Sequence, residues 1–309
     1  MPRRPGPPSP AQYNPAPPPR VHLARELPRA ELAAHLRDGR WEKIRHGAYV
    51  EKIEIPDAYE QQRQRALAHV AAVGRQNVRE RVFSHVSAAL LHGLPVMGPV
   101  SQVHLAQTSP GGARDASDVR RHFVELPDSQ VTSRHGLLVT SLERTLVDCA
   151  TALPRRQGLV IADAALHVGA DHDECSRILE GVRSARGVVA ARWVLAASDP
   201  GTESAGETLA RFEVLLAGLP RPVTQLRVEA ESHVYWADLG WPEHRVLLEY
   251  DGKAKYEANG RASAAVLAEK RRQDRLEAAG WTVVRVASPD LRRPTPWLAR
   301  LATILGPRP

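Results

Sequence analysis

The chain has 309 residues and a net charge of +7, and it is 43% hydrophobic and 25% charged. This composition is typical of a soluble globular protein and excludes a globally disordered chain. No apolar run approaches the roughly 18 residues of a membrane-spanning helix, and no apolar segment follows the amino-terminal arginines as in a secretory signal. The two cysteines, Cys149 and Cys175, form neither a disulfide framework nor a metal-binding pair. We therefore expect a cytoplasmic protein with no membrane contact.

The amino-terminal end carries most of the excess positive charge. Residues 1–50 hold nine Lys and Arg against four Asp and Glu, a balance of +5. Nine of the 25 prolines lie in residues 1–20, which predicts a disordered tail there. A basic end favours contact with nucleic acid, because phosphate neutralisation dominates that affinity. A merely solvated basic surface is the alternative.

Residues 21–55 predict a small module that follows this tail. A short helix spans roughly residues 29–37, the Asp38-Gly39 pair ends it, and a basic ribbon runs from residue 40 to 49. A helix followed by such a ribbon is typical of a winged helix-turn-helix. The alternative is a small α/β appendage with a hydrated surface. The side chains that we expect to meet DNA phosphates are Arg29, Arg40, Lys43 and Arg45.

Residues 56–198 predict an α/β middle domain. Helical patterns occur at 59–76, 84–92, 142–153, 159–168 and 175–182, and strand-like patterns at 103–106 and 122–126. Its histidines are scattered, and none has the spacing that places two metal ligands on one helical face. The acidic run Asp171–Glu174 precedes a helix, where capping explains it better than metal binding.

Residues 199–306 predict a domain with the order α-β-β-β-α-β. Its first helix ends near Ala217, three strands lie at 223–230, 234–239 and 246–250, and a second helix at 262–279 precedes a strand at 281–286. The fold class of the whole chain is therefore predicted to be mixed α/β, of the α+β kind.

The hairpin made by the second and third of these strands places acidic side chains together. A turn centred between Glu243 and His244 opposes Asp238 and Glu249 across the ladder. Alternation then predicts one acidic face with Asp238, Glu249 and Asp251. It predicts an apolar face formed by Tyr235, Ala237, Leu239, Val246, Leu248 and Tyr250.

Opposed carboxylates repel one another unless a cation lies between them. Their hard oxygen atoms suit Mg²⁺ or Mn²⁺, so we predict a metal site formed by Asp238, Glu249 and Asp251. Lys253 could stabilise charge in a phosphodiester transition state, and Glu207 on the preceding helix could add a further carboxylate. A solvent-facing acidic hairpin is the alternative.

The segments ADLGWPEHRVLLEYDGKAKY and EKRRQDRLEAAGWTVVRV resemble the PD-(D/E)xK restriction-endonuclease-like fold, in the branch similar to very-short-patch-repair endonucleases. The resemblance covers about residues 200–290 and implies a Mg²⁺-dependent endonuclease acting on DNA, in a fold that often dimerises. Asp238 and Glu249 match the two acidic ligands, and Glu207 matches the family's helical glutamate. Asp251 occupies the place of the motif lysine, which leaves that role to Lys253 or Lys270. Lys255 and Lys270 of the same lysine cluster are further candidates for DNA contact.

The segments RDGRWEKIRHGAYV, FSHVSAALLHGLPV and VTSLERTLVDCA resemble antitoxins of type IV abortive-infection systems. Such antitoxins repress their own operon through an amino-terminal winged helix, and they counteract a cognate toxin. The two resemblances together predict a DNA-acting protein with an endonuclease domain joined to an antitoxin-like region. The alternative is a catalytically silent antitoxin or transcriptional regulator that binds DNA without cutting it.

Overall fold

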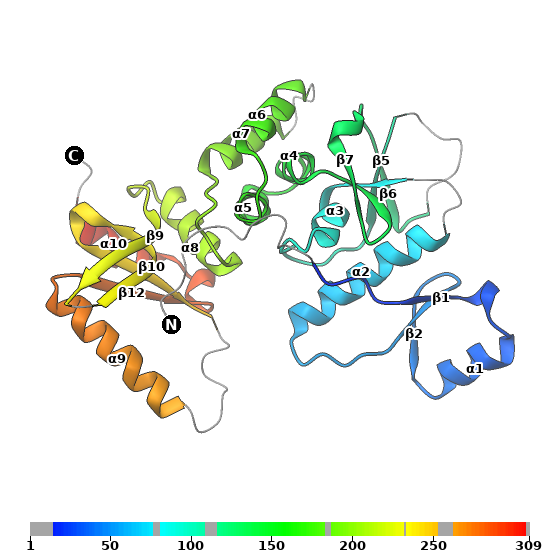
Figure 1. Cartoon of the computed structure of the whole chain (residues 1–309), viewed down its shortest axis with the longest axis horizontal. Coiled ribbons are helices and arrows are strands. Elements are labelled where there is room, and N and C mark those ends of the chain that lie inside the picture. The colour runs from blue at the N-terminus through cyan, green and yellow to red at the C-terminus, as the bar shows by residue number, and fades with distance from the viewer. Residues whose placement is uncertain are drawn as a thin grey trace. The chain divides into compact units, whose positions relative to one another are not determined.

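A computed structural model describes residues 15–76, 81–108, 116–182, 187–231, 233–252 and 262–306, and it does not describe the side chains of 262–269. The described chain is mixed α/β, as the sequence predicts, with three sheets (Figure 1). It divides into two compact units. The amino-terminal unit holds described residues up to 161 together with 170–195, and the carboxy-terminal unit holds 162–169 and the described residues from 196 onward. None of the described helices is long and apolar enough to cross a bilayer.

The module predicted at residues 21–55 is a three-stranded antiparallel sheet with one α-helix. Its elements are β1 (Val21–Leu23), the 3-10 turn η2 (Ala24–Glu26), α1 (Arg29–Arg37), β2 (Trp41–Arg45) and β3 (Ala48–Glu51). The next helix, α2 (Ala58–Gln76), which the sequence predicts as part of the middle domain, packs against this sheet. The strand order is β1-β3-β2, with β3 in the centre. Small and apolar side chains of β1 and β3 pack against Ala68 and Ala72 of α2, which holds the sheet in place. The helix at 29–37 and the ribbon after it are confirmed.

The rest of the amino-terminal unit surrounds a five-stranded mixed sheet of order β6-β5-β4-β8-β7. Its strands are β4 (Val82–Phe83), β5 (Val103–Gln107), β6 (Val119–Phe123), β7 (Val131–Arg134) and β8 (Leu137–Thr140). The accompanying helices are α3 (His85–Leu91), α4 (Leu142–Ala152), α5 (Arg155–His167), α6 (His172–Gly181) and α7 (Val188–Ala197), and the 3-10 turn η3 is Asp128–Gln130. The last residues of α5, from 162, and of α7, from 196, belong to the carboxy-terminal unit. The strand predicted at 122–126 begins earlier, because Val119 pairs in register with Val103 of β5. Asp171 caps α6 by accepting the amide N–H groups of Asp173 and Glu174, as predicted.

The carboxy-terminal unit has the predicted order α-β-β-β-α-β. The elements are α8 (Ala205–Leu216), β9 (Val223–Ala230), β10 (His233–Trp241), η4 (Pro242–His244), β11 (Val246–Asp251), α9 (Ala262–Ala278) and β12 (Thr282–Ala287), followed by η6 (Asp290–Arg292) and α10 (Thr295–Leu305). The sheet order is β12-β11-β10-β9, and only the pair of β11 and β12 among these described strands is parallel. A parallel pair needs a crossover, which α9 supplies.

The β10–β11 hairpin has the predicted register, but its faces differ from the prediction. Leu239 pairs with Leu248, which is the register that opposes Asp238 and Glu249. Ala237, however, belongs to a core cluster with Leu247 of β11 and Leu276 of α9. Strict alternation would place Ala237 on the other face, with Leu248. The alternation is broken at Asp238, opposite Gln225 of β9, whose φ of 47° departs from extended geometry.

A buried ion pair fixes the interior of the carboxy-terminal unit. The Arg211 guanidinium on α8 reaches both carboxylate oxygens of Asp163, at 2.8 and 2.6 Å. Asp163 also accepts hydrogen bonds from the hydroxyl groups of Thr202 and Thr208 and from the amide of Asp199. Arg211 and Asp163 are both fully buried, so each charge depends on the other.

Candidate functional site

The hairpin places Asp238 and Glu249 beside each other, as predicted, and both side chains are buried. The Asp238 carboxylate takes part in a hydrogen bond within the sheet. Its carboxylate accepts the backbone N–H of Tyr250 on β11 at 2.8 Å. Asp238 therefore replaces part of the hydrogen-bond ladder at the point where the alternation of β10 is broken.

The charge of Glu249 is balanced by arginine. The Arg272 guanidinium on α9 forms an ion pair with the Glu249 carboxylate, donates to the carbonyl of Trp236 at 3.1 Å, and lies 5.7 Å from the centroid of the Tyr235 ring. Arg285 on β12 lies 4.0 Å from Glu249 and 3.8 Å from Asp251. These arginines balance the negative charge that a divalent cation would balance in the predicted site. The Mg²⁺ site therefore stays a prediction, and we derive no metal-dependent step from it.

Glu207 has a structural partner of its own. Ser204 accepts the N–H of Glu207 at 3.2 Å, and the Glu207 carboxylate accepts from the Ser204 hydroxyl at 2.9 Å and from the Glu203 N–H at 2.8 Å. This is a variant of the capping box, in which the carboxylate accepts the amide one residue before the N-cap Ser204, and it satisfies amide groups at the start of α8. It accounts for the burial of Glu207, which is only 3% exposed.

The structure describes one of the three lysines predicted in the carboxy-terminal domain. Lys253 and Lys255 lie outside the described residues, so the motif lysine and one predicted DNA contact stay predictions. Lys270 is exposed on α9. Of the predicted nuclease site, the structure thus describes the acidic members and Lys270 alone.

The predicted DNA-contacting side chains of the amino-terminal module differ in their availability. Arg45 is committed to Asp118, with contacts of 3.0 and 3.2 Å, and the same carboxylate binds His69 at 2.8 Å. Arg40 is exposed but shares its charge with Asp38 at 2.8 Å. Arg29 and Lys43 are exposed and make no ion pair with any described residue.

Helix α1 carries one further candidate for DNA contact that the sequence did not predict. Arg37 is exposed and, within the described ranges, has no acidic partner. Arg29, Ala33 and Arg37 are spaced four residues apart, so they lie along one exposed face of α1. The small Ala33 between the two arginines would allow close approach of a phosphate backbone. We define Arg29, Arg37 and Lys43 as the α1 basic surface.

A ring stack fixes α1 against the sheet. Trp41 of β2 lies between His22 of β1 and His35 of α1, with ring centroids 4.1 Å apart on both sides. Burial of the His22 ring lowers the pKa of that histidine, so it is held in its neutral form. The stack therefore holds α1 with its opposite face, the one that bears Arg29 and Arg37, toward solvent.

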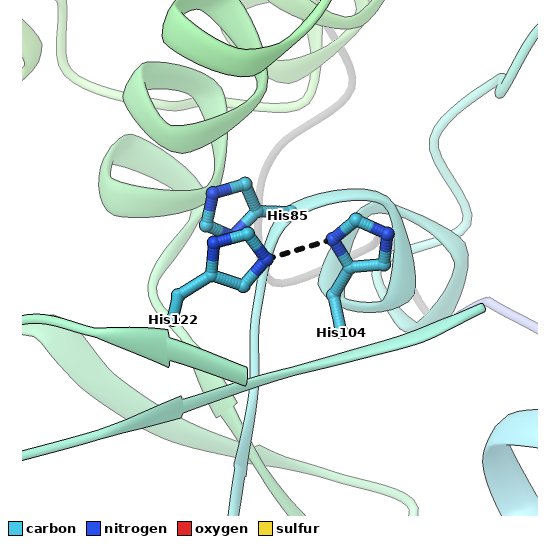
Figure 2. A group of neighbouring side chains, drawn as sticks. All are labelled: His85, His104 and His122. Atoms are coloured by element: carbon cyan, nitrogen blue, oxygen red, sulfur yellow. Dashed lines mark hydrogen bonds between the residues drawn. The ribbon is translucent and has the colours of Figure 1, made fainter. Parts of the chain in front are cut away.

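Three histidines far apart in sequence converge in the amino-terminal unit (Figure 2). His85 begins α3, His104 lies on β5 and His122 on β6. One ring nitrogen of each lies within 4.8 Å of the others. Nδ1 of His104 is 2.9 Å from Nε2 of His122, and the rings of His85 and His122 stack at 3.6 Å. We call these three residues the histidine trio.

Burial governs the electrostatics of the histidine trio. It lowers the pKa of His85 to about 2 and the pKa values of His104 and His122 to about 4. All three rings are therefore neutral at pH 7. Sequence spacing gives no signal for this cluster, because its members lie on three separate elements.

Residues 82–197 match the family model described as the AbiEi antitoxin C-terminal domain. The match begins at β4 and ends at α7, and it includes the whole histidine trio. It supports the antitoxin-like part of the sequence interpretation.

Two curated relatives extend beyond that domain. They are the uncharacterized protein MT2308 of Mycobacterium tuberculosis (strain CDC 1551 / Oshkosh) and the uncharacterized protein Rv2248 of strain ATCC 25618 / H37Rv. Each is 28% identical over 279 residues, which cover 89% of this chain and 96% of the relative. Among solved structures, the crystal structure of the RV2827C protein from Mycobacterium tuberculosis has 17% identity and a TM-score of 0.38, covering 69% of this chain and 84% of that one.

Proposed function

We propose that this chain is an antitoxin-like transcriptional regulator that binds DNA without cutting it. The match of residues 82–197 to an antitoxin domain carries this proposal. An antitoxin of this kind implies a cognate toxin as partner and DNA as the regulatory target. The α1 basic surface is the part of the described chain that we assign to the DNA.

The arrangement of the amino-terminal module supports this assignment. Helix α1 lies between β1 and β2 in the chain, and β3 lies between those two strands in the sheet. This places one helix beside a β2–β3 ribbon, as in a winged helix. Arg29 and Arg37 on the helix and Lys43 on the ribbon are cations without acidic partners among described residues, so their charge is available to phosphates.

The state of the carboxylates supports a chain that does not cut DNA. Arg272 and Arg285 balance Glu249 and Asp251, and Asp238 is bound to the Tyr250 amide. The endonuclease interpretation remains a prediction. The observation in its favour is the register that sets Asp238 beside Glu249, within the order α-β-β-β-α-β.

DNA binding is tested with a labelled duplex from the region upstream of the chain's own gene, beside a duplex of scrambled sequence. We expect tighter binding to the upstream duplex and a linear fall of log K with log salt concentration. The double variant Arg29→Ala/Arg37→Ala should reduce the salt slope by about 2, because each lost phosphate contact removes about one unit. Its matched control is Arg293→Ala/Arg300→Ala, which removes two exposed arginines of the carboxy-terminal unit.

The outcomes separate the function from the surface assigned to it. Absence of DNA binding at low salt would overturn the regulator. Binding with the same slope in both double variants would keep the regulator and reject the α1 basic surface. Cleavage of the duplex with Mg²⁺, lost in Asp238→Ala, would restore the endonuclease interpretation. Co-purification with the product of a neighbouring gene would test the toxin partner.

A further inference from the structure

The sheet register explains why two members of the histidine trio meet. Strands β5 and β6 are parallel, and His104 pairs in register with Arg120. His122 lies two residues further along β6, so it has the same orientation relative to the sheet as Arg120 and shares a face with His104. The 2.9 Å separation of their ring nitrogens follows from this placement.

Two hydrogen bonds fix the third member above that face. The Ser84 amide donates to the His104 carbonyl at 3.1 Å, and the Ser87 hydroxyl accepts the His104 amide at 2.9 Å. The start of α3 is thereby attached to β5 at His104 itself. His85 has a φ of 51°, which is uncommon for a residue other than glycine. Strained backbone of this kind persists where the surrounding structure demands it, and it clusters at functional sites.

A hydroxyl group and a carboxylate lie beside the buried His85 ring. Oδ2 of Asp148 on α4 lies 3.8 Å from Nδ1 of His85, and the Ser84 hydroxyl lies 3.0 Å from the same nitrogen. Arg144 donates to the other carboxylate oxygen of Asp148 at 2.8 Å, which fixes the carboxylate and takes up the charge of that arginine. Histidines that bind metals commonly hydrogen-bond through their other ring nitrogen to an oxygen that orients the ring. Here the Ser84 hydroxyl takes that place, and the Asp148 carboxylate lies beyond hydrogen-bond distance.

We propose that the histidine trio binds a divalent transition-metal ion of the Zn²⁺ class. Imidazole nitrogens suit Zn²⁺, and three histidines leave a fourth position for water. Nitrogens bound to one tetrahedral Zn²⁺ lie about 3.3 Å apart, given Zn–N distances of about 2.0–2.1 Å. His104 and His122 are already within a few tenths of an ångström of that separation. One ring nitrogen of His85 lies within 4.8 Å of theirs, so the His85 ring must turn for that nitrogen to reach the ion.

The burial of the three rings indicates how a metal ion would reach the histidine trio and which elements it would join. His85 is buried at 6% exposure, whereas His104 and His122 are half-buried, so an ion can enter from their side. The bound ion would join α3, β5 and β6 across the middle of the antitoxin-like domain. The site is independent of the proposed DNA binding, since it lies outside the α1 basic surface.

The test titrates the full chain, freed of metal by a chelator, with ZnCl₂ in a calorimeter and with CoCl₂ in a spectrophotometer. We expect one ion per chain and the visible absorption of tetrahedral Co²⁺. The variant His104→Gln/His122→Gln should lose at least ten-fold in Zn²⁺ affinity. The control His46→Gln removes one exposed imidazole elsewhere in the same unit and should bind as the wild type does. Absence of binding in the wild type, or equal binding in the double variant, would overturn the site.

A second measurement avoids substitution and decides the matter if the double variant fails to fold. Diethyl pyrocarbonate acylates the neutral ring nitrogens of accessible histidines, and mass spectrometry locates the products. Zn²⁺ should protect His104 and His122 of the wild-type chain while His46 reacts unchanged. Equal modification of His104 and His122 with and without Zn²⁺ would show that the trio is held together by hydrogen bonding and stacking alone.

Discussion

The cations of the amino-terminal module and those of the carboxy-terminal sheet stand in opposite situations. Arg29, Arg37 and Lys43 are exposed and have no acidic partner in the described part of the chain, whereas Arg272 and Arg285 face Glu249 and Asp251. Both regions are rich in charge, and sequence alone marks both as candidate sites. Whether a charged side chain is available to a ligand therefore depends more on its ion pairs in the folded chain than on the local composition of the sequence.

The largest effect should come from Arg211, a fully buried cation. Arg211→Met removes the guanidinium that Asp163 requires, and an uncompensated buried carboxylate costs about 3–5 kcal/mol. Chemical denaturation, followed through the transition of the carboxy-terminal unit, measures the loss. The control Arg300→Met alters an exposed arginine of α10 and should stay within about 0.5 kcal/mol of the wild type. A loss below about 1 kcal/mol in Arg211→Met would mean that burial does not couple the two charges as argued.

The next prediction exchanges one arginine for a metal ion. Arg272→Met should lower the free energy of unfolding by about 1–3 kcal/mol, because Glu249 loses a charged hydrogen-bond donor. We expect Mn²⁺ to raise the Tm of this variant by binding the carboxylates that Arg272 no longer pairs, and to leave the wild-type Tm unchanged. Thermal unfolding with and without Mn²⁺ checks both.

A response of the wild-type chain to Mn²⁺ would contradict this prediction. If Mn²⁺ raises the wild-type Tm and the chain nicks plasmid DNA in a metal-dependent manner, then the ion displaces Arg272 and Arg285 from the carboxylates. Asp238→Ala is the matched variant, since nicking that persists without this carboxylate would come from a contaminating nuclease.

Local patterns were sufficient to predict much of the fold. The helix at Arg29–Arg37 and the strand at Val223–Ala230 have the predicted bounds, and the hairpin register follows from one turn position. These features depend on neighbours in sequence, such as the Asp38-Gly39 stop and the alternation of apolar residues. The faces of β10 could not be predicted, because the positive φ of Gln225 on a neighbouring strand accompanies the break in alternation at Asp238.

The candidate sites show the same limit more sharply. The opposition of Asp238 and Glu249 was predictable, whereas the ion pair of Glu249 with Arg272 depends on how α9 packs against the sheet. The histidine trio gave no signal, since its members are separated by 19 and 18 residues and meet only through the β5–β6 register and the position of α3. Motif spacing detects ligands on one element, and these lie on three.

The smallest predicted effect separates two cations that sequence treats alike, Lys43 and Arg45 of β2. Lys43 makes no ion pair among described residues, so Lys43→Ala should reduce the salt slope of DNA binding by about 1 and leave stability unchanged. Arg45 is held by Asp118 and half-buried, so Arg45→Ala should leave the slope unchanged while lowering the free energy of unfolding by about 1 kcal/mol. Salt titrations of DNA binding and urea denaturation of both variants decide this. Equal slopes for Lys43→Ala and the wild type would exclude the ribbon from the DNA interface and leave α1 to carry it alone.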